Sequence, residues 1–247
     1  MARGFGWYLD RLAARHFSSV RWAWREDPGG WPRDPLLLVA NHTNWWDGFL
    51  AHQVTRALGL HFQILMDAKG VAAYPVFKRF GAVPVRRDSA PGSVADLHAV
   101  GQNLRPGVAV WIFPQGERRP QGARVAECEH GAAHLALTSD RVRIVPVAFR
   151  YPFLSEQLPE GFVLLGDSWV AGRGDGPAGG RHARQALTAE IERRLNDVVA
   201  GLDARLAAEA VGEFRILIRG RLSINKRMDR VRHTAGLLGG PFEERNG

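Results

Sequence analysis

This sequence of 247 residues has one cysteine and no long apolar run. The lone cysteine, Cys128, excludes an internal disulfide, and such scarcity is typical of proteins from a reducing compartment. No apolar stretch approaches the ~18–20 residues that a membrane-spanning helix needs. The N-terminus lacks the uninterrupted apolar core of a signal peptide, because Asp10, Arg11 and Arg15 interrupt it. We therefore expect a cytoplasmic protein.

Lysine is also scarce, so almost all of the positive charge is arginine. The formal net charge is +8 at pH 7, and the lysines are Lys69, Lys78 and Lys226. Excess positive charge favours an anionic partner, which leaves a membrane surface, a phosphorylated substrate and nucleic acid as alternatives. The arginines are spread along the whole chain and no nucleic-acid-binding motif is recognisable. We therefore expect no nucleic-acid partner.

Residues 4–25 are predicted to form an amphipathic helix. One half of its helical wheel is apolar and carries Phe5, Tyr8, Leu9, Leu12, Ala13, Phe17, Val20 and Trp24. The other half carries Arg11, Arg15, Arg21 and Arg25. Tryptophan and arginine together suit the headgroup region of a bilayer, so residues 1–32 are interpreted as a membrane-interface helical segment. Packing of this helix on its own domain is an equally good alternative.

Apolar runs and helical patterns alternate from residue 35 to residue 150. Strands are predicted at 35–40, 61–66, 82–86, 108–113 and 143–149, and helices at 46–58, 70–79, 92–104 and 125–138. This alternation predicts an α/β sandwich with a largely parallel central sheet. A glycine-rich loop at 171–180 and a charged helix at 182–209 follow. The basic segment 214–232 is either a helix or a strand plus a helix, and we assign 33–247 to one α/β domain.

The segment from Asn41 to Asp47 follows the predicted strand 35–40 and holds a histidine and an aspartate. Two positions five apart on a regular helix point away from each other, whereas a strand–turn–helix corner lets Asp47 reach His42. A carboxylate on one ring nitrogen leaves the other nitrogen to take a proton from a hydroxyl. The alternative is an ordinary helix start in which Asn44 caps, Asp47 completes a capping box and His42 has no chemical role.

Three further segments lie at the ends of predicted strands. Gly81–Arg87 ends in two arginines, Phe113–Arg118 follows an apolar run, and Ile144–Val147 is an apolar strand with a proline. Ligands of α/β sheets bind outside the carboxyl ends of the strands, where these loops emerge. In order and spacing, the four segments resemble the four sequence blocks of the glycerophospholipid acyltransferase family, which includes the 1-acylglycerol-3-phosphate acyltransferases. The resemblance covers roughly residues 35–150.

The resemblance implies an acyltransferase in which His42 is the general base and Asp47 orients it through the His-x4-Asp motif. The deprotonated acceptor hydroxyl would attack an acyl thioester on coenzyme A or acyl carrier protein without a covalent acyl-enzyme. The lack of a Gly-x-Ser-x-Gly nucleophile elbow agrees with this. Arg87 and Arg118 are implied to bind the acceptor's phosphate. Gly116 would let the loop approach the ligand, and a backbone N–H there is a candidate oxyanion donor.

The third block departs from the family sequence Phe-Pro-Glu-Gly-Thr-Arg, because Gln115 and Glu117 replace its glutamate and threonine. Both are kept as acceptor-binding candidates, but Glu117 places a carboxylate beside Arg118, which disfavours phosphate. Arg86 replaces an aspartate of the second block and suggests a charge-swapped pair with Glu117. The resemblance still implies lysophosphatidic acid as the first expected acceptor. The alternatives are a non-phosphate lipid or glycolipid acceptor, or a non-catalytic lipid-binding protein on the same scaffold.

No metal and no cofactor are expected beyond acyl-CoA or acyl-ACP as a co-substrate. Glu127, His130 and His134 have the spacing of one helix face, but no second cluster of ligands supports a metal site. The expected partners are a thioester donor, a lysolipid acceptor and an anionic membrane surface. We expect the enzyme to be cytoplasmic and peripherally bound to the inner face of the membrane.

Overall fold

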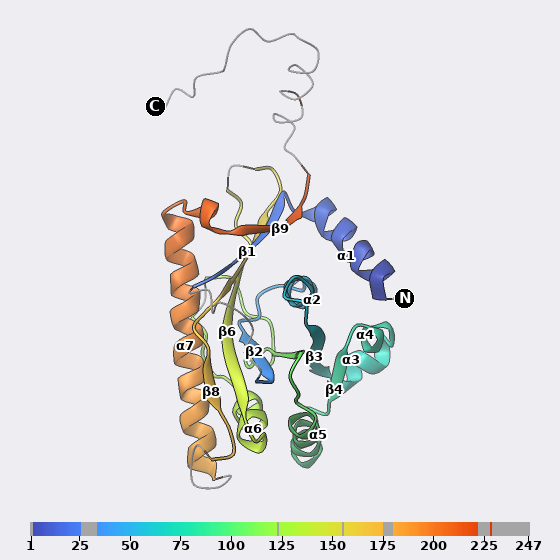
Figure 1. The fold of residues 1–247 in the computed structure, drawn as a ribbon, viewed down its shortest axis with the longest axis vertical. Coiled ribbons are helices and arrows are strands. Elements are labelled where there is room, and N and C mark those ends of the chain that lie inside the picture. The colour runs from blue at the N-terminus through green and yellow to red at the C-terminus, as the bar shows by residue number, and fades with distance from the viewer. Residues whose placement is uncertain are drawn as a thin grey trace.

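The computed structural model describes residues 2–25, 34–122, 124–154, 156–174, 180–221 and 228. Their strands are β1 (Ser19–Trp24), β2 (Leu36–Ala40), β3 (His61–Asp67), β4 (Ala82–Val85), β5 (Val108–Ile112), β6 (Val142–Arg150), β7 (Glu160–Leu165), β8 (Trp169–Ala171) and β9 (Arg215–Arg219). They form one nine-stranded sheet in the order β4-β3-β5-β2-β6-β7-β1-β9, with β8 paired to β6 (Figure 1).

The centre of the sheet is parallel. Strands β4, β3, β5, β2 and β6 all run in one direction, and antiparallel pairing occurs between β6 and β7, between β6 and β8, and between β1 and β9. Every residue of β2 and of β5 is buried. Strands covered on both faces need uninterrupted apolar sequence, which Leu36–Ala40 and Val108–Ile112 supply. The predicted α/β fold with a largely parallel sheet is confirmed.

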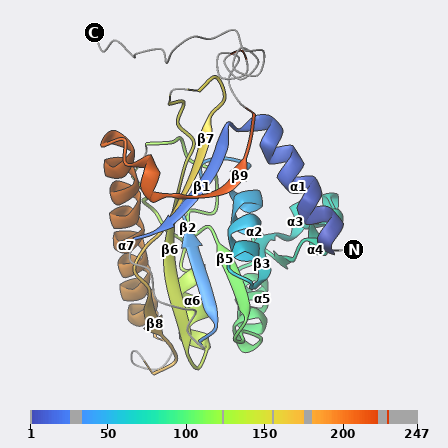
Figure 2. The ribbon, with the colours of Figure 1, turned by 45° about the horizontal axis from the view of Figure 1, so that its top comes forward.

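Helices cover both faces of this sheet. On one face lie α1 (Ala2–His16), α2 (Asp47–Ala57), α3 (Ala68–Ala73) and α4 (Val76–Arg79). On the other lie α5 (Ala90–Gln102), α6 (Gly131–Thr138) and α7 (Arg181–Ala207), and a short 3-10 helix η1 (Val211–Glu213) precedes β9. Figures 1 and 2 both show α7 and α1 at opposite sides of the molecule. Among the described residues, no helix combines the length and apolarity required to cross a bilayer.

The helix predicted over residues 4–25 is wrong beyond His16. Ser19–Trp24 form β1, which pairs with β7 in parallel and with β9 in antiparallel. Val20 is fully buried and Trp22 nearly so, because the sheet continues on both sides of this strand. Val20 and Trp24, four positions apart, fit one face of a helix as well as one face of a strand, and the long-range pairing decides between them. The described part of the predicted 1–32 helical segment is therefore a helix followed by a strand.

The remaining elements differ from the predictions at a few boundaries. The helix predicted at 70–79 is divided into α3 and α4, because Pro75 lacks an N–H and disfavours a helical residue before it. The helix predicted at 125–138 begins only at Gly131. The strand β9 supports the strand-plus-helix alternative for 214–232, although 222–227 and 229–232 lie outside the described residues. Residues 175–179 of the predicted glycine-rich loop lie outside them as well.

Candidate active site

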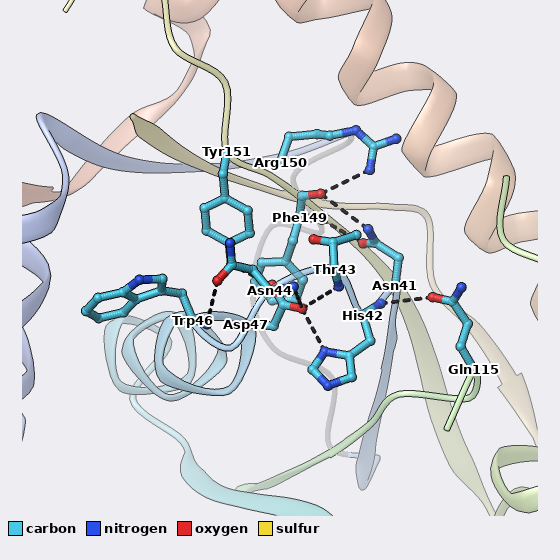
Figure 3. A network of polar contacts seen from close by, with 10 residues as sticks. All are labelled: Asn41, His42, Thr43, Asn44, Trp46, Asp47, Gln115, Phe149, Arg150 and Tyr151. Atoms are coloured by element: carbon cyan, nitrogen blue, oxygen red, sulfur yellow. Dashed lines mark hydrogen bonds and ion pairs between the residues drawn. The ribbon is translucent and has the colours of Figure 1, made fainter. Parts of the chain in front are cut away.

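The turn between β2 and α2 brings His42 and Asp47 together at the carboxyl end of the central strand. Nδ1 of His42 lies 2.8 Å from Oδ2 of Asp47 (Figure 3). The chain reverses between Ala40 and Asp47, so two residues five positions apart meet across the corner, as predicted. The imidazole stacks on Phe113 with 4.4 Å between ring centroids. Because Asp47 engages Nδ1, Nε2 is the ring nitrogen left to accept a proton from a substrate.

Asp47 is completely buried, and hydrogen bonds surround its carboxylate. Oδ2 accepts from the backbone N–H groups of Thr43 at 2.7 Å and of Asn44 at 2.9 Å, in addition to facing His42. Oδ1 accepts from the hydroxyl of Tyr151 at 2.6 Å. A buried charge is tolerated when such donors replace water. These contacts fix the carboxylate in one orientation and present Oδ2 to the imidazole.

The alternative in which Asn44 caps the helix is wrong, because α2 begins at Asp47, its N-cap is Trp46 and no side chain caps it. Oδ1 of Asn44 accepts from the N–H of Trp46 at 3.3 Å, and Oδ2 of Asp47 accepts from the N–H of Asn44. These hydrogen bonds stabilise the turn that joins β2 to α2, and they leave the contact between His42 and Asp47 in place. One carboxylate closes the turn and also orients the imidazole of His42.

Tyr151 is a residue of this site that the sequence interpretation missed. It directly follows β6, the parallel neighbour of β2, and only 5% of it is exposed. Burial, together with the nearby Asp47 carboxylate, raises the pKa of the Tyr151 phenol well above its usual value. The phenol is thus kept protonated as a hydrogen-bond donor. The available signal was a tyrosine four residues after the fourth block, just past the end of the predicted strand.

Gln115 supports the histidine instead of facing an acceptor. Its Oε1 accepts from the backbone N–H of His42 at 2.9 Å, and the residue is 7% exposed. Asn41 also holds this loop to β6. Its Oδ1 accepts from the N–H of Phe149, and its Nδ2 donates to the carbonyl of the same residue. Figure 3 shows these two side chains flanking the segment that carries His42. The acceptor-binding role predicted for Gln115 is corrected to that of holding the loop.

His42 lines a cavity of about 700 Å³. On the α1–α4 face of the sheet its walls are mostly aliphatic and aromatic side chains, among them Leu9, Phe49, Phe62, Ile64, Phe77 and Phe80. On the α5–α7 face they include Leu65, Val85, Leu97 and Ile112. Cavities of this size and apolar character are typical of small-molecule sites. The volume and lining are suitable for a fatty chain.

Two half-buried imidazoles also line this cavity. Desolvation is the first cause that lowers the pKa of His52 on α2 and of His134 on α6, and nearby arginines lower both further. Each has a buried ring nitrogen without a hydrogen-bond partner among the described residues. Both rings are therefore neutral near pH 7, and they add little charge to the cavity.

Three of the residues predicted to bind the acceptor, Arg87, Gly116 and Arg118, line the same cavity, together with Glu129. The Arg87 guanidinium donates to the carbonyl of Gly116 and forms an ion pair with Glu129, a second residue that the sequence interpretation missed. Within the described part of the chain, Arg118 makes neither an ion pair nor a hydrogen bond. The N–H of Gly116 donates to the carbonyl of Phe113 at 3.0 Å, so the oxyanion role suggested for this N–H is wrong.

Glu117 does not line the cavity, and its partner is Arg119 at 2.8 Å. Arg86 pairs with Asp96 at 2.6 Å, and this hydrogen-bonded arginine lowers the pKa of Asp96 to about 2. The predicted charge-swapped pair of Arg86 with Glu117 is therefore wrong. Arg119 also donates its backbone N–H to the carbonyl of His42 at 2.8 Å. This hydrogen bond ties the loop to the backbone of the histidine.

Glu127, His130 and His134 do not share one helix face, because α6 begins only at Gly131 and Glu127 has a φ of 56°. The imidazole of His130 instead makes a 2.9 Å hydrogen bond with Thr188 on α7. In the residues that the structure describes, no group of three or more His, Cys, Asp and Glu side chains is placed to hold a metal ion.

Comparison with known proteins adds a family match. The model of a family described as Acyltransferase matches residues 26–150, a span that contains the His42–Asp47 turn and all four sequence blocks. A similar solved structure is the crystal structure of the 1-acyl-sn-glycerophosphate (LPA) acyltransferase, PlsC, from Thermotoga maritima. It is 16% identical to this chain, has a TM-score of 0.48, and the match covers 79% of this chain and 78% of that one. No protein with a curated description matches significantly.

Proposed function

Because this chain belongs to the acyltransferase family and is an acyltransferase enzyme, we propose that it moves a fatty acyl group from a thioester donor to the hydroxyl of a lipid acceptor. One observation carries the proposal. The imidazole of His42, fixed by a buried carboxylate 2.8 Å away, lines a cavity with largely apolar walls. The proposed reaction uses a base to take the proton of the acceptor hydroxyl and an apolar cavity to hold the fatty chain.

The proposed mechanism uses His42 as a general base. Nε2 takes the proton from the acceptor hydroxyl while the hydroxyl oxygen attacks the carbonyl carbon of the thioester. A new C–O bond forms, the C–S bond breaks, and the imidazolium returns the proton to the departing thiolate. Asp47 stabilises the imidazolium through Oδ2 and keeps the tautomer in which Nε2 is unprotonated at the start. The donor is acyl-CoA or acyl-ACP, and no other cofactor enters the proposal.

Two classes of acceptor fit the cavity. Lysophosphatidic acid is the first, since Arg87 and Arg118 both line the cavity and arginine suits phosphate. A lipid or glycolipid without a phosphate is the second. The ion pair between Arg87 and Glu129 favours this second class, because the pair occupies one of the two arginines.

We also propose that the enzyme works at the inner surface of the membrane. Helix α1 exposes Trp7 and Tyr8, and the guanidinium of Arg11 lies 4.9 Å from the centre of the Trp7 ring. Leu9 of the same helix lines the cavity, and so does Trp45, which is half exposed. A helix that offers aromatic and cationic groups suits the headgroup region, and this one borders the entrance for a lipid.

The proposal is tested with the purified protein, acyl-CoA and acyl-ACP, and a panel of acceptors. The panel contains lysophosphatidic acid, other lysophospholipids, monoacylglycerol and a glycolipid, and mass spectrometry identifies the product. We expect a new ester with at least one donor–acceptor pair. Binding to liposomes without any ester product would favour the non-catalytic lipid-binding alternative and reject the enzyme mechanism.

A further inference from the structure

We propose that Glu129 determines acceptor specificity in this cavity by occupying Arg87 and disfavouring lipids that carry a phosphate monoester. The inference rests on the proposed acyl transfer and names the acceptor class: a hydroxyl-bearing lipid whose headgroup has no phosphate monoester. Neither Glu129 nor its contact with Arg87 belongs to the four sequence blocks that suggested lysophosphatidic acid.

The geometry of Arg87 carries the first step. An arginine holds phosphate best through parallel donors of its planar guanidinium. Both terminal nitrogens of Arg87 already donate, Nη1 to the carbonyl of Gly116 and Nη2 to Oε1 of Glu129. A phosphate can therefore engage this guanidinium at full strength only if it displaces the Glu129 carboxylate.

The loop is shaped around this ion pair. The backbone N–H of Glu129 donates to the carbonyl of Pro114 at 2.7 Å, which ties residue 129 to the loop that carries Gly116. A Cβ atom on residue 116 would collide with both Oε1 of Glu129 and Nη2 of Arg87. Gly116 also has a φ of 70°, a conformation that glycine adopts without strain. Gly116 thus suits the left-handed backbone of this loop and leaves room for the ends of the two side chains.

The charge balance at the cavity carries the second step. Arg87 and Glu129 cancel each other, and Arg118 is left as the cation beside them that has no partner in the described part of the chain. A phosphate monoester carries about −1.5 to −2 charges at pH 7. In this part of the cavity it would meet the carboxylate of Glu129 as well as the guanidinium of Arg118. An uncharged hydroxyl can instead donate to the second oxygen of Glu129 or accept from Arg118 without displacing the ion pair between Arg87 and Glu129.

The exposure of the two side chains limits how strongly Glu129 can disfavour a phosphate. The side chains of Arg87 and Glu129 are 42% and 54% exposed, so water screens the repulsion between Glu129 and a phosphate. We therefore expect a bias of about three- to tenfold and not complete exclusion. This is large enough to measure by direct binding.

The test compares binding of hexanoyl lysophosphatidic acid, a soluble short-chain probe, to His42→Ala protein with and without Glu129→Gln. Glu129→Gln keeps the shape of the side chain and removes its charge, so we expect binding about three- to tenfold tighter by calorimetry. Glu127→Gln is the matched control, because it removes the same charge two residues away from a side chain that is 81% exposed and pairs with Arg119. It should change binding by less than about twofold.

Thermal unfolding of each variant verifies that the fold is retained. Unchanged or weaker binding of the probe after Glu129→Gln overturns the proposal. It is also overturned if the probe binds neither to the His42→Ala protein nor to the variant that carries both changes. In the active enzyme, Glu129→Gln should also lower the ratio of kcat/KM for monoacylglycerol to kcat/KM for lysophosphatidic acid by about three- to tenfold. A protein that shows the binding change but transfers no acyl group contradicts the proposed function and leaves the specificity inference standing.

Discussion

The hydroxyl of Tyr151 donates a hydrogen bond of 2.6 Å to Oδ1 of Asp47, on the side of the carboxylate away from His42. Tyr151 and His42 therefore hold the two oxygens of one buried carboxylate. Tyr151 does not line the cavity and so does not touch a substrate there. It is a positioning residue, which acts on the chemistry only through the orientation of Asp47.

Tyr151→Phe should impair turnover and stability together. The change leaves Oδ1 of Asp47 buried without its donor, which costs about 1–3 kcal/mol of unfolding free energy. We expect kcat to fall by about tenfold with little change in KM, because the substrate contacts stay in place. Urea unfolding and steady-state kinetics measure the two effects. Tyr74→Phe removes a hydroxyl from a tyrosine that is 63% exposed, and it should alter neither. An unchanged kcat in Tyr151→Phe would show that this hydrogen bond does not position Asp47.

Asp47→Asn should be far more damaging. An amide has one oxygen, whereas the carboxylate accepts hydrogen bonds at both of its oxygens and stabilises a positive imidazolium. The tautomer of His42 would no longer be fixed, and we expect kcat to fall by about two to four orders of magnitude, by analogy with other buried carboxylate–histidine pairs. Asp88→Asn, at an exposed carboxylate paired with Lys69, serves as the control for activity and folding. A loss smaller than about tenfold in Asp47→Asn would contradict the proposed role.

Cys128 should be unreactive in the folded protein. Burial, helped by the carboxylate of Glu192, raises the pKa of this thiol from 9.0 to about 12. At pH 8 the thiolate fraction is then roughly a thousandfold lower than in the unfolded chain. The raised pKa also means that this group's contribution to stability is complete below pH 9 and is lost as the pH rises towards 12. Iodoacetamide labelling at pH 8, with and without urea, measures the difference. Similar rates in both states would contradict the buried placement.

Trp7→Ala should weaken binding to membranes. Trp7 is 60% exposed on α1, and its loss removes an amphipathic ring from the surface proposed to meet the bilayer. We expect several-fold weaker cosedimentation with anionic liposomes and little change in thermal stability. Trp169→Ala is the matched control, because Trp169 also lies beside an arginine, Arg194, but sits on β8 next to α7 (Figure 1). Equal losses in the two variants would argue against α1 as the contact surface.

The sequence predicts the centre of the fold well because the relevant signals are local. A strand buried on both faces is an unbroken apolar run, as in Leu36–Ala40, and this pattern needs no knowledge of its neighbours. The strand β1 could not be recognised in the same way. Its Val20 and Trp24 also fit one face of an amphipathic helix, and its partners β7 and β9 lie far along the chain. A local sequence pattern does not show which distant strands pair with each other.

The contacts of the site also differ in whether a local sequence pattern predicts them. The contact between His42 and Asp47 is predictable because one short turn makes it. The contact between Asp47 and Tyr151 joins residues 104 positions apart, and that between Arg87 and Glu129 joins residues 42 apart. Both depend on how strands and loops are arranged in space. The error for Gln115 has the same origin, since only the fold shows that its amide faces the backbone of His42.

The central claim is that His42 removes the proton from the acceptor hydroxyl, and the transfer rate of His42→Ala tests it most directly. The variant should retain the fold, measured by circular dichroism and thermal unfolding, and bind liposomes like the unmodified protein. Its acyl transfer should fall below the detection limit of the same mass-spectrometric assay, because the imidazole that Asp47 orients is removed. Turnover at a substantial fraction of the normal rate would contradict the mechanism.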